Sequence, residues 1–385
     1  MKKIEDHNID VFIISDNAIE SIGGEQESTK IIIEGVKDEF KLGVIQPGVV
    51  TKKLSGVTYF HMTDKTRIKH LIKKPFDFLK YMNKVKNIIH STNPKIIHTQ
   101  SQVSFFIIAL LKKIRLIPKS IKFIHTERGL YTKYNRFFKS LFLFCMKELD
   151  TLITTTEFNM RYWKNALNGR VEPKNYEIIE NTAGKLFEYY DPSKKKKDDG
   201  RFVVGFAGRY ASWKNWPLAV DISKKLKEKL GDKVVVKMAV GCLDQESLNK
   251  TNKMFKYMEG VFGDSFEGKI NISLEEMDQF YYNLDAFILT SNKNTESFGR
   301  TIVEAMSRNV VVLSTDAGGP VEILDNPDNI LNNADEFVAR LIQFFENSNM
   351  IQNEIARNQK IVKSKYSLKN NISKHRKLYK NYIFK

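Results

Sequence analysis

The chain has 385 residues, of which 42% are hydrophobic and 11% aromatic, so its composition is that of a folded protein and not of a disordered one. It is too long for one ordinary hydrophobic core, and two domains of about 180 residues each are expected. Its 62 Lys and Arg against 45 Asp and Glu give a net charge of +17, which favours an anionic partner: nucleic acid, a phosphorylated ligand or an acidic membrane surface.

The cysteine content and the apolar runs bear on where the protein works. Only Cys145 and Cys242 are present, far apart in the sequence, so we expect no disulfide framework and a reducing cytoplasm. Residues 1–8 carry charges where a signal peptide needs apolar residues. No apolar run approaches the roughly 20 residues that a membrane span requires, so we expect a protein that is not integral to a membrane.

The first half of the chain alternates short apolar runs with helical patterns, which is typical of a parallel α/β sheet. Residues 10–15 predict a strand, followed by Gly23-Gly24 and a helix from about residue 25. This order outlines a loop at which a phosphate approaches the backbone, although an ordinary turn fits the glycine pair equally well. Residues 122–127 predict a later strand, and His125 stands where its apolar run gives way to a loop.

Two regions of the first half combine basic residues with apolar or aromatic ones. Residues 65–90 predict a Lys-rich helical region, and residues 131–147 alternate basic and aromatic groups. Both regions fit helices on a membrane surface. Residues 131–147 also fit a core-packed helix with a solvated basic face, or a single-stranded nucleic-acid contact. The predicted apolar side of the first region comprises Leu71, Ile72, Phe76, Phe78, Leu79 and Tyr81.

The second half opens after a charged stretch at residues 193–200, which predicts the linker region. Residues 202–208 predict a buried strand, and Arg209 and Lys214 lie in the loop that follows it. Two cations five residues apart at the end of a strand suit a diphosphate, with Arg as a bidentate donor and Lys as a point charge.

Residues 286–322 predict one βαβ unit, which organises the second half. An apolar strand at 286–289 leads into a polar loop that Glu296 closes, and Ser297 is predicted to cap a helix. A second strand at 310–313 and a turn at Gly318-Gly319-Pro320 follow. The two loops therefore open at the same edge of a parallel sheet, where α/β proteins bind ligands.

The start of the predicted helix has the chemistry of a nucleotide-sugar site. The backbone at Phe298, Gly299 and Arg300 offers amide groups and the positive end of the helix dipole to a phosphate. Carboxylates repel phosphates, so Glu296 and Glu304 are expected to bind hydroxyls of a sugar or a ribose.

The segment Glu296-Ser-Phe-Gly-Arg-Thr-Ile-Val-Glu304, with Asp316-Ala-Gly-Gly-Pro-Val-Glu322 after it, resembles the Glu-(seven residues)-Glu motif of retaining glycosyltransferase family 4. That family has the GT-B fold: α/β, with two doubly wound Rossmann-like domains facing each other across a cleft. Gly23-Gly24, His125 and the Arg209/Lys214 pair also occur in the family's order. Residues 308–310 depart from the Gly-x-Pro that the family often has before the second strand of this unit.

The resemblance implies a retaining, metal-independent hexosyltransferase that moves a sugar from a nucleoside-diphosphate donor, with UDP favoured by its frequency in the family. The implied acceptor is a glycan, a lipid-linked molecule or a cell-surface polymer. No metal-binding motif stands out, and no cofactor or nucleic-acid partner is expected.

The resemblance also implies roles for individual residues. The catalytic residues would be His125 at the sugar, Glu296 at the sugar hydroxyls, and Arg209 and Lys214 at the leaving phosphate. The substrate-binding residues would be Gly23, Gly24, Arg209, Lys214, Ile270 beside the nucleotide base, Phe298, Gly299, Arg300 and Glu304 at the ribose.

The implied domains are residues 1–188, which would bind the acceptor, and residues 189–367, which would bind the nucleotide sugar. A helix at about 368–385 would pack back on the first domain. The expected location is the cytoplasm, with peripheral contact of the basic-aromatic helices at the inner face of the plasma membrane.

Two alternatives stay open from the sequence. One is a nucleotide-sugar epimerase or a phosphorylase of the same architecture. The other is a non-catalytic basic module that binds nucleic acid or membrane, for which a steep salt dependence is expected.

Overall fold

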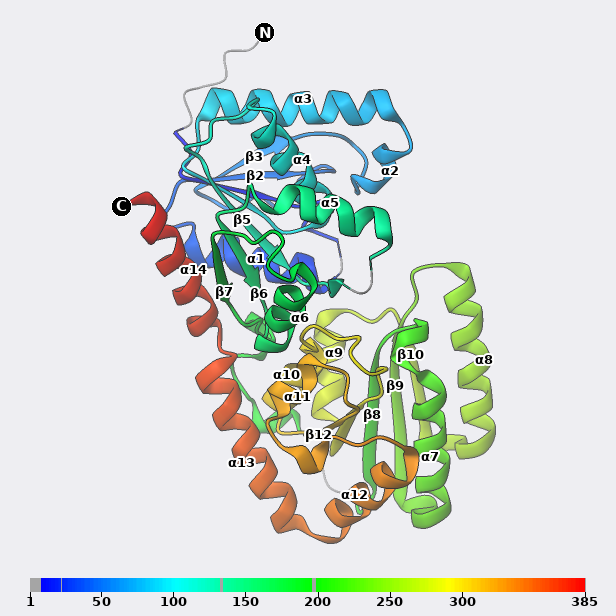
Figure 1. Ribbon diagram of the computed structural model, residues 1–385. Helices are drawn as coiled ribbons and strands as arrows, with labels where there is room; N and C mark the ends of the chain where they lie inside the picture. The colour runs from blue at the N-terminus through cyan, green and yellow to red at the C-terminus, as the bar shows by residue number, and fades with distance from the viewer. Residues whose placement is uncertain (1–7, 22, 132–133, 196–198, 385) are drawn as a thin grey trace. The chain divides into compact units, whose positions relative to one another are not determined.

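The computed structural model describes residues 8–21, 23–131, 134–195 and 199–384. The chain divides into two compact units: unit 1 holds residues 1–181 and 368–385, and unit 2 holds residues 182–367 (Figure 1). Most of the N-terminal segment discussed above, residues 1–7, and the centre of the predicted linker, residues 196–198, lie outside the described residues.

Unit 1 is built on a seven-stranded sheet in the order β3-β2-β1-β4-β5-β6-β7, with every strand pair parallel. Successive side chains of a strand point to opposite faces, so Val11 and Ile13 enter one core and Phe12 and Ile14 the other. The strands are β1 (Val11–Ile14), β2 (Leu42–Gln46), β3 (Val57–His61), β4 (Ile96–Thr99), β5 (Lys122–Glu127), β6 (Thr151–Thr154) and β7 (Asn175–Ile178).

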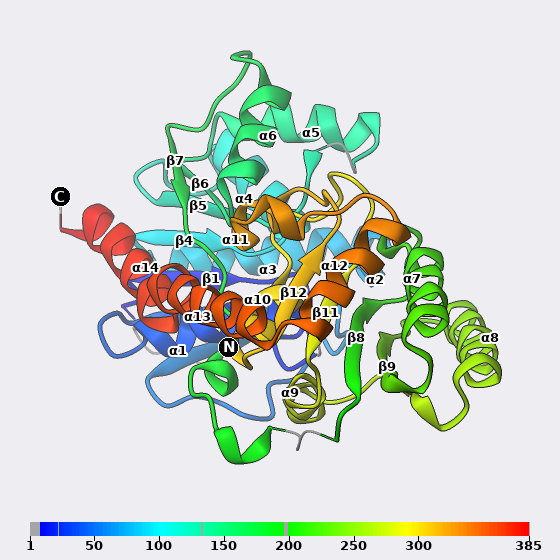
Figure 2. The same ribbon diagram turned by 90° about the horizontal axis from the view of Figure 1, so that it is seen from below.

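Helices cover both faces of this sheet (Figures 1 and 2). Helices α3, α4 and α5 pack in the core that contains Phe12, whereas α1 and α14 pack in the core that contains Val11. The helices of unit 1 are α1 (Gly24–Val36), α2 (Lys69–Ile72), α3 (Pro75–Thr92), α4 (Gln102–Lys113), α5 (Arg136–Met146), α6 (Glu157–Leu167) and α14 (Leu368–Ile383).

Unit 2 repeats this plan with five parallel strands in the order β10-β9-β8-β11-β12. The strands are β8 (Phe202–Arg209), β9 (Val234–Gly241), β10 (Phe266–Ile270), β11 (Ala286–Leu289) and β12 (Val311–Ser314). The helices are α7 (Trp216–Leu230), α8 (Gln245–Phe262), α9 (Leu274–Tyr282), α10 (Arg300–Ser307), α11 (Gly319–Leu324), α12 (Ala334–Glu346) and α13 (Ser348–Lys365). Both units are thus doubly wound, and the predicted fold class of two Rossmann-like domains is confirmed.

The division between the units falls at residues 181 and 182, a few residues before the predicted boundary at 188. The reason is that residues 183–187 belong to the core of unit 2, where Ala183 and Phe187 are buried. Arg308 is 1% exposed and donates hydrogen bonds to the carbonyl oxygens of Leu186 and Phe187, which fixes this segment to unit 2.

Helix α14 lies on unit 1 although the chain reaches it from unit 2. The Tyr379 hydroxyl is 2.6 Å from Nδ1 of His98 on β4, and the Arg376 guanidinium donates to the carbonyl of Gly35 on α1. Both contacts join α14 to elements more than 250 residues earlier in the sequence, so the unit-1 core is complete only with this helix in place.

The helical region predicted at 65–90 differs from the structure in two respects. It consists of two helices, α2 and α3, because Pro75 begins α3 and a proline favours the first turn of a helix. Leu71 and Tyr81 are buried as predicted, whereas Ile72, Phe76 and Leu79 are exposed. None of the described helices is long and apolar enough to cross a membrane.

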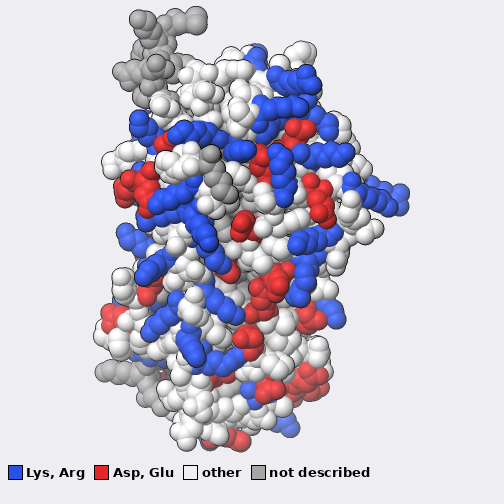
Figure 3. All heavy atoms as spheres, turned by 60° about the vertical axis from the view of Figure 1, so that its left-hand side comes forward, with Lys and Arg blue, Asp and Glu red and all other residues white. Residues whose placement is uncertain are grey.

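The excess positive charge of the chain resides in unit 1. Unit 1 has 36 Lys and Arg against 19 Asp and Glu, whereas unit 2 has 26 of each. Within residues 51–147 the ratio is 21 to 3. Figure 3 shows how densely Lys and Arg side chains occur on one face of the molecule.

The buried His375 predicts how stability of unit 1 depends on pH. Burial lowers the pKa of His375 from 6.5 to about 4, and Nε2 of this ring has no hydrogen-bond partner among the described residues. The folded state therefore favours the neutral ring, so its contribution is full above pH 6.5 and is lost as the pH falls towards 4. Relative to His375→Phe, the wild type should lose about 2 kcal/mol of unfolding free energy between neutral pH and about pH 5, measured by urea unfolding. Equal pH profiles for the two proteins would contradict this account.

Candidate functional site

Each sheet changes winding direction at one point, and polar residues follow the strands there. In unit 2 this point lies between β8 and β11, and in unit 1 between β1 and β4. Helices that leave neighbouring strands in opposite directions open a crevice at the carboxyl edge, where doubly wound proteins bind ligands. The candidate site residues of each unit lie at this edge.

An ion pair occupies the carboxyl edge of unit 2. Nζ of Lys214, in the loop after β8, lies 2.9 Å from Oε1 of Glu296, in the loop after β11. The Ser291 hydroxyl donates to the same oxygen at 2.9 Å. The two charged side chains are 14% and 16% exposed, so the pair is sheltered from water and yet open to a ligand.

The loop that carries Lys214 is fixed by its neighbours. The Thr290 hydroxyl donates to the carbonyl of Lys214 at 2.8 Å, and the amide of Asn292 donates to the carbonyl of Trp213 at 2.7 Å. Gly208 leaves room for the lysine side chain, since a Cβ there would lie 3.3 Å from its Cε. The cation is therefore held in position by both strands that flank the crevice.

The segment between Glu296 and α10 is locked against the loop after β12. The amide of Glu296 donates to the carbonyl of Ala317, and the amide of Gly319 donates to the carbonyl of Glu296, both at 2.9 Å. A Cβ at Gly319 would lie only 2.4 Å from the carbonyl oxygen of Ser297. This close approach of two backbones explains why a glycine is required at position 319.

Helix α10 begins at Arg300 and its N-cap is Gly299, so the prediction that Ser297 caps the helix is wrong. Gly299 has φ of +104°, a backbone conformation that favours glycine over serine or any other L-residue. A glycine at the N-cap offers no side chain to the first turn of α10, and this turn begins at the carboxyl edge, where the positive end of the helix dipole favours an anion.

Arg300 and Glu304 lie one turn apart on α10 and form an ion pair of 3.3 Å. The hydroxyl of Tyr281 on α9 donates to the other oxygen of Glu304 at 2.9 Å, and Arg300 also donates to the carbonyl of Ala183 at 2.8 Å. Burial, and next the negative charge of Glu304, raise the pKa of Tyr281 well above its ordinary value. The phenol therefore stays protonated and keeps Glu304 in a fixed orientation.

The other predicted residues of unit 2 take different positions. Arg209 ends β8 with an exposed side chain that has no acidic partner among the described residues. Ile270 ends β10 at the opposite end of the sheet order and packs partly into the core. The Phe298 ring is 3% exposed and stands edge-on to Tyr366 at 5.6 Å, so only its backbone is a candidate for ligand binding.

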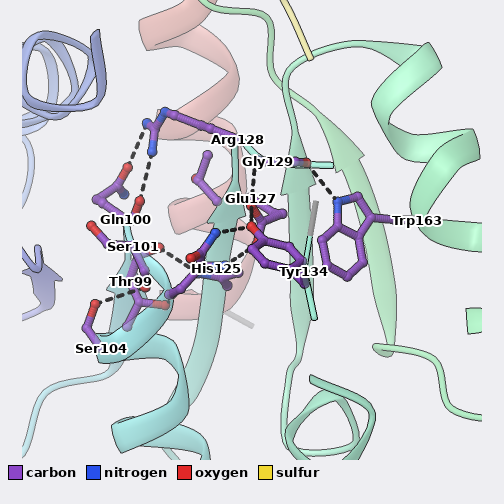
Figure 4. Close-up of polar contacts among 12 residues, drawn as sticks. Thr99, Gln100, Ser101, Ser104, His125, Glu127, Arg128, Gly129, Tyr134 and Trp163 are labelled. Carbon is purple, nitrogen blue, oxygen red and sulfur yellow. Dashed lines mark hydrogen bonds and ion pairs between the residues drawn. The ribbon is translucent and has the colours of Figure 1, made fainter. Parts of the chain in front are cut away.

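His125 lies at the carboxyl edge of unit 1, at the end of β5 (Figure 4). It is fully buried and its ring stacks on Phe105 at 4.6 Å. Its Nδ1 lies 2.9 Å from the Thr99 hydroxyl and its Nε2 3.4 Å from Oε2 of Glu127. Both ring nitrogens thus face partners within unit 1, which does not support the predicted direct contact with a sugar.

Glu127 and Arg128 organise the loop that follows His125. Oε1 of Glu127 accepts hydrogen bonds from the amide of Gly129 at 2.6 Å and from the Tyr134 hydroxyl at 3.1 Å. Arg128 donates to the backbone and side-chain oxygens of Gln100, at 3.1 and 2.8 Å. The loop after β5 is therefore tied to the end of β4 (Figure 4).

Gly23 and Gly24 stand at the start of α1, as predicted, but next to acidic groups. The first turn of α1 carries Glu25 and Glu27, whose charges compete with a phosphate for the helix N-terminus. Asp16 follows β1 and accepts hydrogen bonds from two amides of α4, and burial raises its pKa to about 7. This edge suits a ligand rich in hydroxyls better than one rich in phosphate.

The described residues contain no group of three or more His, Cys, Asp or Glu that could hold a metal ion. Arg209, Lys214 and Arg300 place positive charge at the unit-2 edge.

Several residues at these carboxyl edges were not predicted from the sequence. Tyr281 is 23 positions from Glu304, and no pattern in the sequence predicts their contact. Ser291 and Glu127 could have been found, since each is a polar residue at the carboxyl end of a strand. Gln100 shares that signal, because it follows β4 directly.

Two protein-family models match the chain. The model described as Glycosyltransferase Family 4 matches residues 44–182, and the model described as Glycosyl transferases group 1 matches residues 190–361. The two matches fall on unit 1 and unit 2, respectively.

Two curated proteins are similar to this chain in sequence. An uncharacterized glycosyltransferase of Methanocaldococcus jannaschii is 27% identical over 68% of this chain and 65% of its own length. The 2-deoxystreptamine N-acetyl-D-glucosaminyltransferase of Niallia circulans is 28% identical over 36% of this chain and 35% of its own length. The alignments thus span less than two thirds of either relative.

Solved structures share the whole fold at low sequence identity. A glycosyltransferase of Rickettsia africae has a TM-score of 0.75 and 18% identity, and the match covers 98% of this chain and 99% of that one. Sucrose-phosphate synthase of Thermosynechococcus elongatus has a TM-score of 0.79 and 12% identity, covering 97% and 98%. HepE of Anabaena, solved with UDP-glucose, has a TM-score of 0.72 and 14% identity, covering 96% and 99%. With both family models matched in order along a doubly wound pair of units, the chain belongs to the GT-B glycosyltransferases.

Proposed function

We propose that the protein transfers a hexose from a nucleoside-diphosphate sugar, with retention of configuration, and that unit 2 binds the donor. The observation that carries this proposal is the Lys214–Glu296 ion pair beside the start of α10. It combines a fixed cation, a fixed carboxylate and a helix N-terminus at one sheet edge. A sugar diphosphate offers the matching groups: phosphate charge for the cation and amides, and hydroxyls for the carboxylate.

The cations of the unit-2 edge would stabilise the leaving nucleoside diphosphate. As the glycosidic bond breaks, negative charge grows on the diphosphate and positive charge on the sugar. Lys214, Arg209 and the backbone amides at Phe298, Gly299 and Arg300 are the groups that we assign to this negative charge. Because these cations and amides supply the counter-charge, we propose that the reaction needs no metal ion.

The two carboxylates would hold hydroxyls. Glu304 is fixed by Tyr281 and Arg300, so it presents its remaining acceptor sites in a set orientation, and we assign it to the ribose. Glu296 is fixed by Lys214 and Ser291, and we assign it to the transferred sugar. A carboxylate paired with a lysine is a weak nucleophile, which favours same-face attack by the acceptor over a covalent enzyme intermediate. Ile270 remains our candidate for a backbone contact to the nucleotide base.

The donor is proposed to be a UDP-sugar. HepE, whose fold this chain shares, was solved with UDP-glucose, and this likeness supports UDP by analogy of fold alone. A screen of UDP-, GDP- and ADP-sugars, read as release of the nucleoside diphosphate, would test the proposal. Turnover of a donor without acceptor and without hydrolysis would indicate an epimerase.

Unit 1 is proposed to bind the acceptor, a glycan that is lipid-linked or part of a cell-surface polymer. Glu25 and Asp16 near Gly23 and Gly24 give its edge hydrogen-bond acceptors that suit sugar hydroxyls. We propose that His125 positions Glu127 and the loop after β5 and does not touch the sugar. A cytoplasmic location agrees with two cysteines that form no disulfide.

Loss of Lys214 should slow the chemical step. Lys214→Ala removes a fixed cation from the leaving phosphate, and kcat should fall about 100-fold or more, as when one anion-stabilising donor is lost. Lys225→Ala is the matched control, because Lys225 forms an ion pair of 2.7 Å with Asp335 on the surface of the same unit. Its kcat should equal that of the wild type. Wild-type turnover by Lys214→Ala would refute the assignment.

Loss of Glu304 should weaken donor binding. Glu304→Ala removes a charged hydrogen-bond acceptor from the ribose, and the donor KM should rise roughly 10-fold or more. Tyr281→Phe distinguishes binding of the donor by Glu304 from the role of Tyr281 in holding Glu304 in place. It removes one hydrogen bond to Glu304 and leaves the carboxylate present. Its KM should rise much less, and an equal rise in both variants would show that Glu304 acts only through the packing of α9 against α10.

A further inference from the structure

The helix layer of unit 1 formed by α3, α4 and α5 exposes apolar side chains to an unusual extent. In the described residues, 14 large hydrophobic side chains are exposed, and eight of them lie between residues 72 and 144. These eight are Ile72, Phe76, Leu79, Ile114, Leu116, Phe137, Phe138 and Phe144. They are concentrated in about a fifth of the chain, whereas scattered single residues are the norm on a protein surface.

These side chains are not needed to close the core. Helix α5 buries Phe142, Cys145 and Met146 against the sheet, while Phe137 and Phe144 are 70% and 49% exposed. Residues 137 and 144 are seven positions apart, about two turns, so they share the outward side of the helix. Helix α5 is therefore apolar on both sides, and its outer side has no partner among the described residues that buries it.

Basic groups surround these apolar side chains. Nζ of Lys113 lies 3.8 Å from the centre of the Phe144 ring and donates to the carbonyl of Phe144 at 3.0 Å. Beyond Lys113, a surface depression is lined by His90, Arg115, Ile117, Pro118 and Lys119. Nε2 of His90, on α3, lies 2.7 Å from the carbonyl of Leu116, so this depression joins the end of α3 to the end of α4.

The N-terminal end of α3 has the same mixture of exposed apolar and basic side chains. Phe76 and Leu79 of α3 are 81% and 59% exposed, and Lys73, Lys74 and Lys80 are exposed around them. Asp77 is the acidic residue among them. With 21 Lys and Arg against 3 Asp and Glu in residues 51–147, the potential of this layer is strongly positive.

We propose that this surface docks on an anionic lipid bilayer. It is named here the basic-aromatic face, and consists of the eight exposed apolar side chains with the exposed Lys73, Lys74, Lys80, Arg115, Lys119, Arg136 and Lys147. The apolar side chains enter the boundary between headgroups and acyl chains, and the basic side chains contact lipid phosphates. The depression between His90, Arg115 and Lys119 accepts one headgroup phosphate.

The composition of the basic-aromatic face favours a bilayer over two other possible partners, single-stranded nucleic acid and a second copy of the chain. Single-stranded nucleic acid stacks on aromatic rings, but Ile72, Leu79, Ile114 and Leu116 are aliphatic and offer no ring. A second copy of the chain would bring two faces of the same strong positive charge together, which is repulsive. Acyl chains accept aliphatic and aromatic side chains alike, and anionic headgroups match the charge.

Vesicle flotation tests the proposal on the full chain. The vesicles are phosphatidylcholine alone or phosphatidylcholine with about 30% phosphatidylglycerol, at low and high salt. The wild type should float with the anionic vesicles at low salt and not with phosphatidylcholine alone. The double variant Phe137→Ala/Phe144→Ala should bind at least about 10-fold more weakly, because it loses two side chains from the interface.

Two further variants make the test specific. Lys73→Glu/Lys74→Glu changes charge and keeps every apolar side chain, and it should also weaken binding about 10-fold or more. Leu243→Ala/Tyr257→Ala is the matched control, because both side chains are exposed, at 66% and 47%, in unit 2. It should bind vesicles like the wild type.

The outcome is separable from the proposed transfer reaction, because the residues assigned to the donor lie in unit 2. Release of nucleoside diphosphate from a soluble donor should be unchanged in all three variants, as should their thermal unfolding. Vesicle binding that is unaffected by the Phe137/Phe144 variant would overturn the proposal. So would equal binding to both vesicle types, or binding of single-stranded DNA with no binding of vesicles.

Discussion

The sheltered ion pair between Lys214 and Glu296 is the interaction on which the unit-2 edge depends. Charges are expensive to remove from water unless they are paired, so each of these groups is kept in place by the other. Gly208 leaves room for the lysine side chain, and Gly319 lets the backbone at Ser297 come close. Thr290 fixes the lysine loop from the neighbouring strand. The electrostatic work of orienting the cation is thus done during folding and need not be done when a ligand arrives.

The two units show how one topology produces two chemistries. Both sheets change winding direction next to their first strand, and both put polar residues at the carboxyl edge there. In unit 2 this edge carries Arg209 and the Lys214–Glu296 ion pair beside the start of α10. In unit 1 the residues at this edge are carboxylates, with Glu25 and Glu27 in the first turn of α1. The fold therefore sets where a ligand binds, and the loop residues set which groups of the ligand are recognised.

Much of this arrangement could be predicted from the sequence, because local patterns determine it. The apolar runs at 10–15, 202–208 and 286–289 became buried strands, and the loops after them became the site edges. The N-cap of α10 was missed because Ser297 is a good capping residue by type, whereas the backbone contact between Ser297 and Gly319 decides the geometry. The packing of His125 against Phe105 was not predicted, because Phe105 comes from another element. Contacts between elements distant in sequence have no local pattern.

The position of α14 has a consequence for the order in which the protein folds during synthesis. Unit 2 is one continuous stretch, complete once residue 367 has left the ribosome, whereas unit 1 still lacks residues 368–385 at that point. Until then Ile32, Val36 and His98 have no Leu378 or Tyr379 to cover them. The half of the protein that is made first is thus the half that is finished last, and its apolar flank is open to chaperones for the whole time in which the second half is translated.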